Sequence, residues 1–199
     1  LVVLAASAAR PAQAALESRL GGAAWYDTAL DITWLADASA AAGSAFDDGS
    51  NSVDGRLSWS NALAWAASLD VGGSTAWRLP DMDRNGDDIV VDCATAGAAA
   101  CTDNEYGYHF WFNGIDSQNP GPFTGVDTVN YWSGTEAGST AWLFDFTFND
   151  GSQFDTSQNF KAAAWAVHPG DIAAVPLPAA LWLFAGALAM TGGFARRRH

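Results

Sequence analysis

The sequence predicts a single α+β domain with an antiparallel sheet and one or two helices. Three observations favour this class: short runs of β-branched and aromatic residues between turn formers, one segment with helical periodicity, and a late pair of strands joined by a turn. The chain has 199 residues, of which 49% are hydrophobic and 16% charged. It is therefore long enough to bury a core and too apolar for a disordered acidic tail.

The first predicted elements are short strands. Residues 25–27 lead into residues 29–35, where β-branched and aromatic residues lie between turn formers. A polar loop rich in Gly, Asp, Asn and Ser follows over residues 46–56. These two strand segments begin the predicted sheet.

The spacing predicts one helix over residues 58–69. A serine at position 58 or 60 can cap its amino end, and a Gly-Gly pair at 72–73 follows it. Apolar residues recur at near-helical intervals and would share one face: Trp59, Leu63, Ala66 and Leu69.

The late strands form a predicted hairpin. Residues 142–148 alternate, which places Asp145 and Thr147 on the face opposite the aromatic side chains. Residues 149–152 supply the turn, and residues 162–168 are expected to be the closing strand. The aromatic face consists of Trp142, Phe144, Phe146 and Phe148.

The charge distribution divides the chain into three regions. The net charge is −13, from nine Lys and Arg against 22 Asp and Glu. Residues 1–14 and 176–199 hold four of the bases and no acid, so the middle carries five bases against 22 acids, a net charge of −17. So few cations cannot neutralise a row of phosphates, which excludes nucleic acid as a partner.

Residues 1–14 are predicted to be a truncated signal peptide. A short apolar stretch precedes Arg10, and Ala12-Gln13-Ala14 fits a signal-peptidase site with cleavage after Ala14. An alanine-rich leader without a targeting role is the alternative. Export is favoured because the carboxy-terminal segment, residues 176–199, also has the features of a targeting signal.

Residues 176–199 are predicted to be a sorting tail that contains a transmembrane helix. Pro176 and Pro178 interrupt the chain, and residues 179–195 form an uncharged run of 17 residues. As a helix this run spans about 26 Å at ~1.5 Å per residue, which is adequate for a bilayer core. A buried core helix is the alternative. A basic cluster that would stay on the cytoplasmic side ends the run: Arg196, Arg197 and Arg198.

This tail resembles the PEP-CTERM sorting signal of Gram-negative bacteria, in the variant with Leu177 between the prolines. The resemblance implies recognition by an exosortase-type processing enzyme, transient anchoring in the inner membrane, and coexistence with exopolysaccharide production. The acidic middle region would then lie at the outer surface of the cell or in the extracellular matrix.

The two cysteines suggest a disulfide. Cys93 and Cys101 enclose seven residues, and in an exported protein a bridge across this loop would contribute about 2–3 kcal/mol. Their spacing matches no zinc pattern. A catalytic thiol is the alternative, and formation of the bridge would abolish it.

The acidic loop at residues 81–92 is the sharpest chemical feature of the sequence. Its oxygen donors stand at positions 1, 3, 5, 7 and 12, with Gly86 at position 6, which is typical of calcium loops. The loop ends on an aspartate rather than the longer glutamate, and no helix pair flanks it, so it is not an EF-hand. A solvated turn without a metal is the alternative. The candidate calcium ligands are Asp81, Asp83, Asn85, Asp87 and Asp92.

Several aromatic blocks follow one another in a definite order through residues 25–171. The most distinctive are Trp77-Arg78-Leu79-Pro80 and Tyr131-Trp132-Ser133-Gly134-Thr135. The others are Tyr26-Asp27, Leu30-Asp31, Thr33-Trp34, Trp59, Ala62, Trp65, Ala141-Trp142 and the block 165–170. This series resembles the Lcl C-terminal domain family, a family of unknown function named from a collagen-like bacterial adhesin.

The resemblance implies a C-type-lectin-like fold, related to the group of formylglycine-generating and sulfatase-modifying enzymes. The family usually has arginine at the position of His168 in this chain. The enzymatic branch needs a reactive cysteine pair, and only the closely spaced Cys93 and Cys101 are present, so the resemblance does not carry that oxidase activity to this chain.

The motif residues Arg78, Tyr131 and Trp132 have two interpretations each. Tryptophans spread through a domain usually build its core, and an arginine between apolar residues usually satisfies carbonyls or a carboxylate. The same three side chains also fit a ligand surface, because aromatic rings stack on sugar faces.

Conventional catalytic signatures are absent from the sequence: it contains no H-E-x-x-H helix, nucleophile elbow or phosphate loop. We therefore expect a non-enzymatic, lectin-like domain that binds polysaccharide at the cell surface. A purely structural protein of the envelope or biofilm matrix is the first alternative, and an extracellular hydrolase or oxidase is the second.

Overall fold

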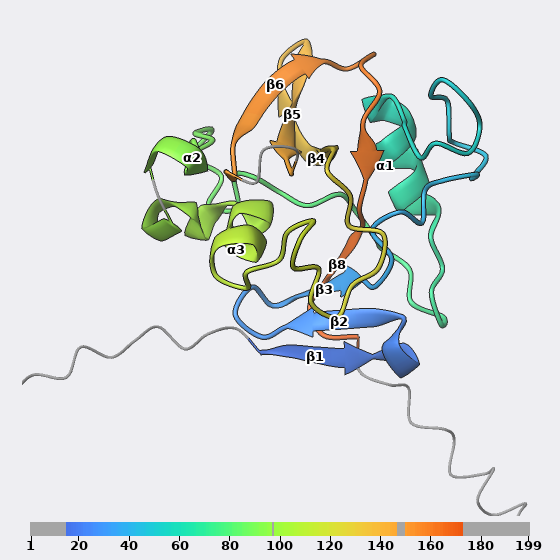
Figure 1. Cartoon of the computed structure of the whole chain (residues 1–199), viewed down its shortest axis with the longest axis horizontal. Helices are drawn as coiled ribbons and strands as arrows, with labels where there is room; N and C mark the ends of the chain where they lie inside the picture. The colour runs from blue at the N-terminus through green and yellow to red at the C-terminus, as the bar shows by residue number, and fades with distance from the viewer. Residues whose placement is uncertain (1–14, 97, 147–149, 173–199) are drawn as a thin grey trace, which may run out of the picture.

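The structure, a computed structural model, describes residues 15–96, 98–146 and 150–172. Within these ranges it has an α+β fold of two four-stranded sheets, three α-helices and two short 3-10 segments (Figure 1). The strands are β1 (Leu16–Arg19), β2 (Ala24–Asp27), β3 (Ile32–Leu35), β4 (Asn130–Ala137), β5 (Thr140–Asp145), β6 (Gln153–Ser157), β7 (Ala163–Ala164) and β8 (Val167–Pro169). The helices are α1 (Trp59–Ser68), α2 (Cys93–Ala96) and α3 (Glu105–Trp111), and the 3-10 segments are η1 (Leu20–Gly22) and η2 (Ala98–Asp103).

The first sheet joins the beginning and the end of the described chain. Its order is β1-β2-β3-β8 and all its pairs are antiparallel. Trp25 pairs with Trp34, and Thr33 pairs with His168. Strand β1 lies before residue 25, so the sheet reaches beyond the amino boundary predicted for the Lcl-like region.

The second sheet has the order β6-β5-β4-β7. Strands β4, β5 and β6 are antiparallel, whereas β7 pairs with β4 in parallel, through Tyr131 with Ala163 and Trp132 with Ala164. The single antiparallel sheet predicted from the sequence is therefore two sheets, one of them mixed.

The predicted closing strand at residues 162–168 is in fact two strands in different sheets. β7 pairs with β4 and β8 pairs with β3, while Trp165 and Ala166 between them are fully buried. One straight strand cannot hydrogen-bond to two separate sheets, so the chain bends here and ties the sheets together. The bend inserts the Trp165 indole into the space between them.

The predicted helix at 58–69 is confirmed as α1, but its buried face differs. Ala62, Trp65 and Ala66 are buried, whereas Trp59 and Leu63 are half-buried. Ser58 precedes the helix without capping it, because its hydroxyl donates to Asp48 Oδ2 at 3.0 Å.

Helix α3 was not predicted, because its aromatic run resembles a strand. Asn104 starts the helix, since its side-chain oxygen accepts from the Gly107 N–H at 2.9 Å. Helix α3 and η2 lie on the side of the molecule opposite α1 (Figure 1).

Strand β5 does not show the predicted alternation of buried and exposed faces. Leu143 and Phe144 are both fully buried and Asp145 is 5% exposed, while Trp142 is only half-buried. Because successive residues are buried, both faces of β5 are covered along this stretch. Phe148 and part of the predicted turn at 149–152 lie outside the described residues.

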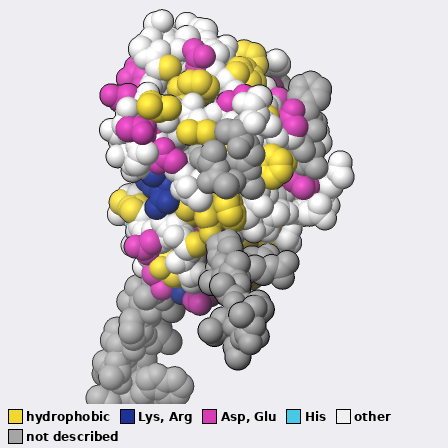
Figure 2. All heavy atoms as spheres, turned by 90° about the vertical axis from the view of Figure 1, so that its left-hand side faces the viewer, with side chains coloured by type: hydrophobic (Ala, Val, Ile, Leu, Met, Phe, Trp, Pro, Cys, Tyr) yellow, Lys and Arg dark blue, Asp and Glu magenta, His cyan; other side chains and the backbone are white. Residues whose placement is uncertain are grey.

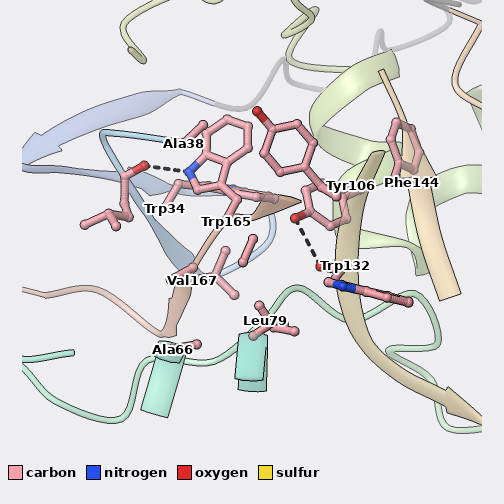
Figure 3. Close-up of a cluster of buried hydrophobic side chains, with 14 of the residues drawn as sticks. Trp34, Ala38, Ala66, Leu79, Tyr106, Trp132, Phe144, Trp165 and Val167 are labelled. Carbon is pink, nitrogen blue, oxygen red and sulfur yellow. Dashed lines mark hydrogen bonds between the residues drawn. The ribbon is translucent and has the colours of Figure 1, made fainter. Parts of the chain in front are cut away.

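The core is an aromatic cluster between the two sheets (Figure 3). Trp34 is central: its ring centroid lies 5.0 Å from that of Trp165, 5.6 Å from Tyr106 and 4.1 Å from His109. The Trp165 indole N–H donates to the Leu35 carbonyl at 2.7 Å, so its polar edge is satisfied inside the core.

Within residues 15–96, 98–146 and 150–172, no helix has the length and apolar character needed to cross a bilayer. The predicted signal peptide at 1–14 and the predicted sorting tail at 176–199, with its proline and arginine motif, lie outside the described residues.

Candidate metal centre and adjoining groove

The acidic loop folds around one carboxylate, that of Asp83. Its Oδ1 accepts from the backbone N–H of Gly86 at 3.0 Å and of Asp87 at 3.1 Å, and its Oδ2 accepts from Asp88 at 2.9 Å. Gly86 and Asp88 have φ values of +71° and +63°, which lets the chain close this tight turn. An aspartate followed by glycine and further aspartates suits this geometry, because short acidic side chains bond to nearby backbone donors.

Three carboxylates converge at this turn: those of Asp83, Asp87 and Asp103. One oxygen of each lies within 4.8 Å of the other two. Two oxygens bound to one Ca²⁺ at about 2.4 Å cannot be more than about 4.8 Å apart, so this spacing fits a shared cation. Asn85 lies at the same place, since its backbone N–H donates to Asp103 Oδ1 at 2.8 Å.

Asp81 and Asp92 have other partners. Asp81 Oδ1 accepts from the Asp83 N–H at 2.9 Å and from the Thr135 hydroxyl at 2.8 Å. Asp92 accepts from the Ala94 N–H at 3.1 Å and the Thr95 hydroxyl at 2.8 Å, at the start of α2. The structure therefore brings together only the middle part of the predicted ligand set.

Asp103 is the member of the cluster that the sequence did not predict. It lies at the end of η2, beyond the cysteine pair and outside any twelve-residue calcium pattern. The only signal in the sequence was the cysteine pair itself, because a bridge between Cys93 and Cys101 shortens the path from the acidic loop to Asp103.

The structure places the sulfurs of Cys93 and Cys101 at disulfide distance, with their Cα atoms 5.5 Å apart. Both cysteines are fully buried. Helix α3 packs directly on them, since a Cβ added to Gly107 would lie 2.6 Å from Cys93 Sγ. This contact fixes η2 against α3 and so holds Asp103 near the loop.

A groove lined by two arginines adjoins the metal candidate. Arg78 makes a two-pronged ion pair with Glu105, at 2.7 and 2.8 Å, and Arg84 Nε lies 3.6 Å from the same carboxylate. Glu105 is 1% exposed. Arg84 also borders the hollow formed with Asn85, Thr102 and Asp103, so it separates the groove from the carboxylate cluster.

The ion pair with Glu105 holds Arg78 firmly in its charged form. Burial disfavours the charged guanidinium, but the hydrogen bonds and the negative charge of Glu105 outweigh it, so the pKa of Arg78 lies above its ordinary value. Glu105 also accepts from the Asp81 N–H at 2.8 Å, which links the loop to α3. One face of the molecule shows Lys and Arg side chains as a compact group among Asp and Glu side chains (Figure 2).

Tyr131 and Trp132 are core residues rather than an aromatic platform. Tyr131 is 1% exposed and Trp132 is fully buried, with its indole N–H donating to the Leu57 carbonyl at 2.7 Å. Neither ring can therefore stack on a sugar. The Arg78 side chain, 38% exposed, is the one member of the three that remains accessible.

His109 is inaccessible to any substrate. It is fully buried and stacked on Trp34, and burial lowers its pKa to about 3. Its Nδ1 lies 3.2 Å from the Asn113 side-chain amide, which in turn donates to Asp27 at 2.6 Å. This chain of contacts orients the ring within the core. His168, where the resembled family has arginine, pairs with Thr33 and packs its ring edge-on against Trp77 at 5.6 Å.

No family model and no curated protein sequence matches this chain. The Lcl-like and PEP-CTERM assignments therefore stay predictions from the sequence blocks.

Proposed function

We propose that this chain is an exported, non-enzymatic recognition domain that binds calcium at Asp83, Asp87 and Asp103 and contacts polysaccharide through the adjoining arginine groove. The observation that carries the proposal is the convergence of the three carboxylates within 4.8 Å. Sorting by an exosortase through residues 176–199 belongs to the proposal on the strength of the sequence resemblance alone.

Calcium suits the cluster because of both charge and ligand chemistry. Three carboxylates at this spacing repel one another, and a divalent cation removes that repulsion. Ca²⁺ accepts six to eight oxygen ligands in adaptable geometry, so carbonyl, amide and water oxygens can complete the set around three carboxylates. The Asn85 side chain supplies an amide oxygen next to Asp87, whose N–H it accepts at 2.8 Å.

The groove supports polysaccharide binding through its position and its charge. Arg84 borders both the groove and the hollow beside Asp103. A sugar chain lying across Arg84 would present hydroxyl or carboxylate oxygens to the cation on one side and to the guanidinium groups on the other. An extracellular hydrolase or oxidase is the alternative, and the fully buried His109 could not serve it as a catalytic group because it cannot reach a substrate.

The calcium site is tested by titrating the full chain with Ca²⁺ in a calorimeter. Asp83→Asn with Asp103→Asn should abolish the binding heat, because two of three charged ligands are removed. The control is Asp70→Asn with Asp150→Asn, which removes the same two negative charges at exposed turns, where these carboxylates accept from the Gly73 and Ser152 N–H groups. Equal heats in the two double variants would remove the site.

The polysaccharide assignment is tested on a glycan array, in calcium and in EDTA. We expect binding in calcium that weakens in EDTA and also in Arg84→Gln. A flat signal under both conditions would favour the purely structural role in the envelope or matrix.

A further inference from the structure

A second cavity lies away from the acidic loop, beside β7 of the second sheet. It has a volume of about 230 Å³ and is walled by residues 38, 39, 41, 42, 54–56, 125–127, 129 and 131 and by β7. Pockets for drug-sized ligands run to roughly 300–1,000 Å³, so this one suits a smaller molecule. It shares no lining residue with the groove of Arg78 and Arg84.

Glycines shape two of its walls. Gly125 has φ +67°, and a Cβ there would overlap the Ser39 hydroxyl and approach Asp37 Oδ1 to 2.7 Å. Gly55 has φ +68°, and its Cβ would come within 3.3 Å of Ala42. A side chain at either position would strain the backbone and crowd the wall of the cavity. The shape of the cavity therefore depends on glycine at both positions.

The inside of the cavity is mainly aliphatic. Its small apolar side chains are Ala38, Ala41, Ala42, Val126, Val129, Ala163 and Ala164. Tyr131 contributes its hydroxyl, which donates to the Gly125 carbonyl at 3.2 Å and accepts from the Asp127 N–H at 3.0 Å. These surfaces would exclude water from an aliphatic group without binding it by polar contacts.

Arg56 supplies the unusual polar feature. It lines the cavity and is half-buried, yet its guanidinium has no hydrogen-bond or ion-pair partner among the described residues. Arg19, Arg78 and Arg84 each pair with a carboxylate. A half-buried guanidinium with five free donors is a ready partner for a carboxylate.

Two carboxylates line the same cavity. Asp54 Oδ1 accepts from the Arg56 backbone N–H at 3.0 Å, not from its guanidinium. Asp127 uses Oδ1 for the Thr128 N–H at 2.7 Å, and its Oδ2 accepts no hydrogen bond from the described residues. The cavity therefore combines one free cationic donor, one free anionic acceptor and an aliphatic interior.

We propose that this cavity binds a small aliphatic zwitterion of the α-amino-acid type. The carboxylate of the ligand pairs with Arg56, its ammonium group pairs with Asp127, and its aliphatic side chain occupies the space between the alanines and valines. An inorganic anion fits less well, because Asp54 and Asp127 repel it. A pyranose ring also fits less well, because the Tyr131 ring is 1% exposed and offers no stacking face.

The experiment is calorimetric titration of the full chain with L-leucine and L-valine. Each is compared with a matched compound that lacks one charge: isovalerate lacks the ammonium group, and isoamylamine lacks the carboxylate. We expect saturable binding of the amino acids and at least tenfold weaker binding of both analogues. This comparison needs no variant, so it stays decisive if a substitution impairs folding.

Two variants then test which residue pairs with each charged group of the ligand. Arg56→Gln should weaken leucine binding at least tenfold without weakening isoamylamine binding, whereas Asp127→Asn should weaken leucine binding without weakening isovalerate binding. Arg19→Gln and Asp150→Asn are the matched controls, since both residues lie outside the cavity, and should bind leucine as the unaltered chain does. Absence of leucine and valine binding at millimolar concentration, or equal binding by Arg56→Gln, would overturn the proposal. Neither result bears on the calcium site, which shares no residue with this cavity.

Discussion

The aromatic core and the acidic layer of the molecule are held together in opposite ways. In the core, Trp34, Tyr106 and Trp165 pack ring against ring with centroids 5.0–5.6 Å from that of Trp34. In the acidic layer, formed by residues 81–92 and Asp103, carboxylates such as that of Asp83 bond to backbone N–H groups of their own loop. The core is therefore expected to supply most of the stability, whereas the acidic layer holds the accessible carboxylates of the candidate metal centre.

Helix α3 joins the two regions. Tyr106 and His109 face the aromatic core, while Glu105 at its first position faces the acidic layer and pairs with Arg78. The disulfide lies against its Gly107. Substitutions along this helix and its neighbours therefore separate the contributions of the two regions.

The largest expected effect is in the core. Trp165→Ala removes a fully buried indole and its hydrogen bond to Leu35, and should lower the free energy of unfolding by about 3–5 kcal/mol. Trp111→Ala is the matched control, since that ring is 38% exposed and should cost about 1 kcal/mol or less. Urea denaturation followed by fluorescence measures both, and equal losses would contradict the assignment of stability to the core.

The next effect concerns the link between the regions. Glu105→Gln keeps the size of the side chain but leaves Arg78 without a charged partner, and should lower the free energy of unfolding by about 2 kcal/mol. The value is below that of a fully buried pair because Arg78 is 38% exposed. Glu136→Gln, at an exposed position, is the control and should change stability by less than about 0.5 kcal/mol. A result for Glu105→Gln as small as for the control would mean that the pair does not hold the layer to the core.

The smallest effect is a pH dependence within the core. Burial lowers the pKa of His109 to about 3, whereas the unfolded chain binds that proton near 6.5. The unfolded state therefore gains protons first as the pH falls below 6.5, so stability is fully present above that pH and is lost below it. For one group the loss is about 1.4 kcal/mol on going from pH 7.5 to pH 5.5.

Substitution of the histidine isolates this contribution. His109→Gln should lower the free energy of unfolding at neutral pH and flatten its slope between pH 7.5 and 5.5, while His168→Gln, at a half-buried position, serves as the control. The measurement is urea denaturation at a series of pH values. An unchanged slope in His109→Gln would show that the buried ring does not govern the acid sensitivity.

The residues show why prediction succeeded in some places and failed in others. Helix α1 was predictable because its apolar residues repeat locally, and the cysteine pair was predictable because its two members are close in sequence. Helix α3 was missed because aromatic residues favour strands when no packing is known. The buried state of Asp145 and the bend at Trp165 were missed because each depends on which sheet lies on the other side.

The candidate metal centre also has a part that the sequence predicts and a part that only the fold shows. The sequence showed that residues 83–87 carry oxygen donors at alternate positions, because a turn is a local property of the chain. Asp103 joined them only in the folded molecule, as did the pairing of Arg78 and Arg84 with Glu105.

The sequence by itself determined the α+β class, helix α1, the cysteine pair and the acidic turn, since each follows from side chains within about a dozen residues of one another. Tertiary structure alone decided the division into two sheets, the burial of Tyr131 and Trp132, and the cavity around Arg56. The physical reason is that burial and charge pairing depend on which distant segments meet. Local patterns specify what a segment can present, and packing determines what it faces.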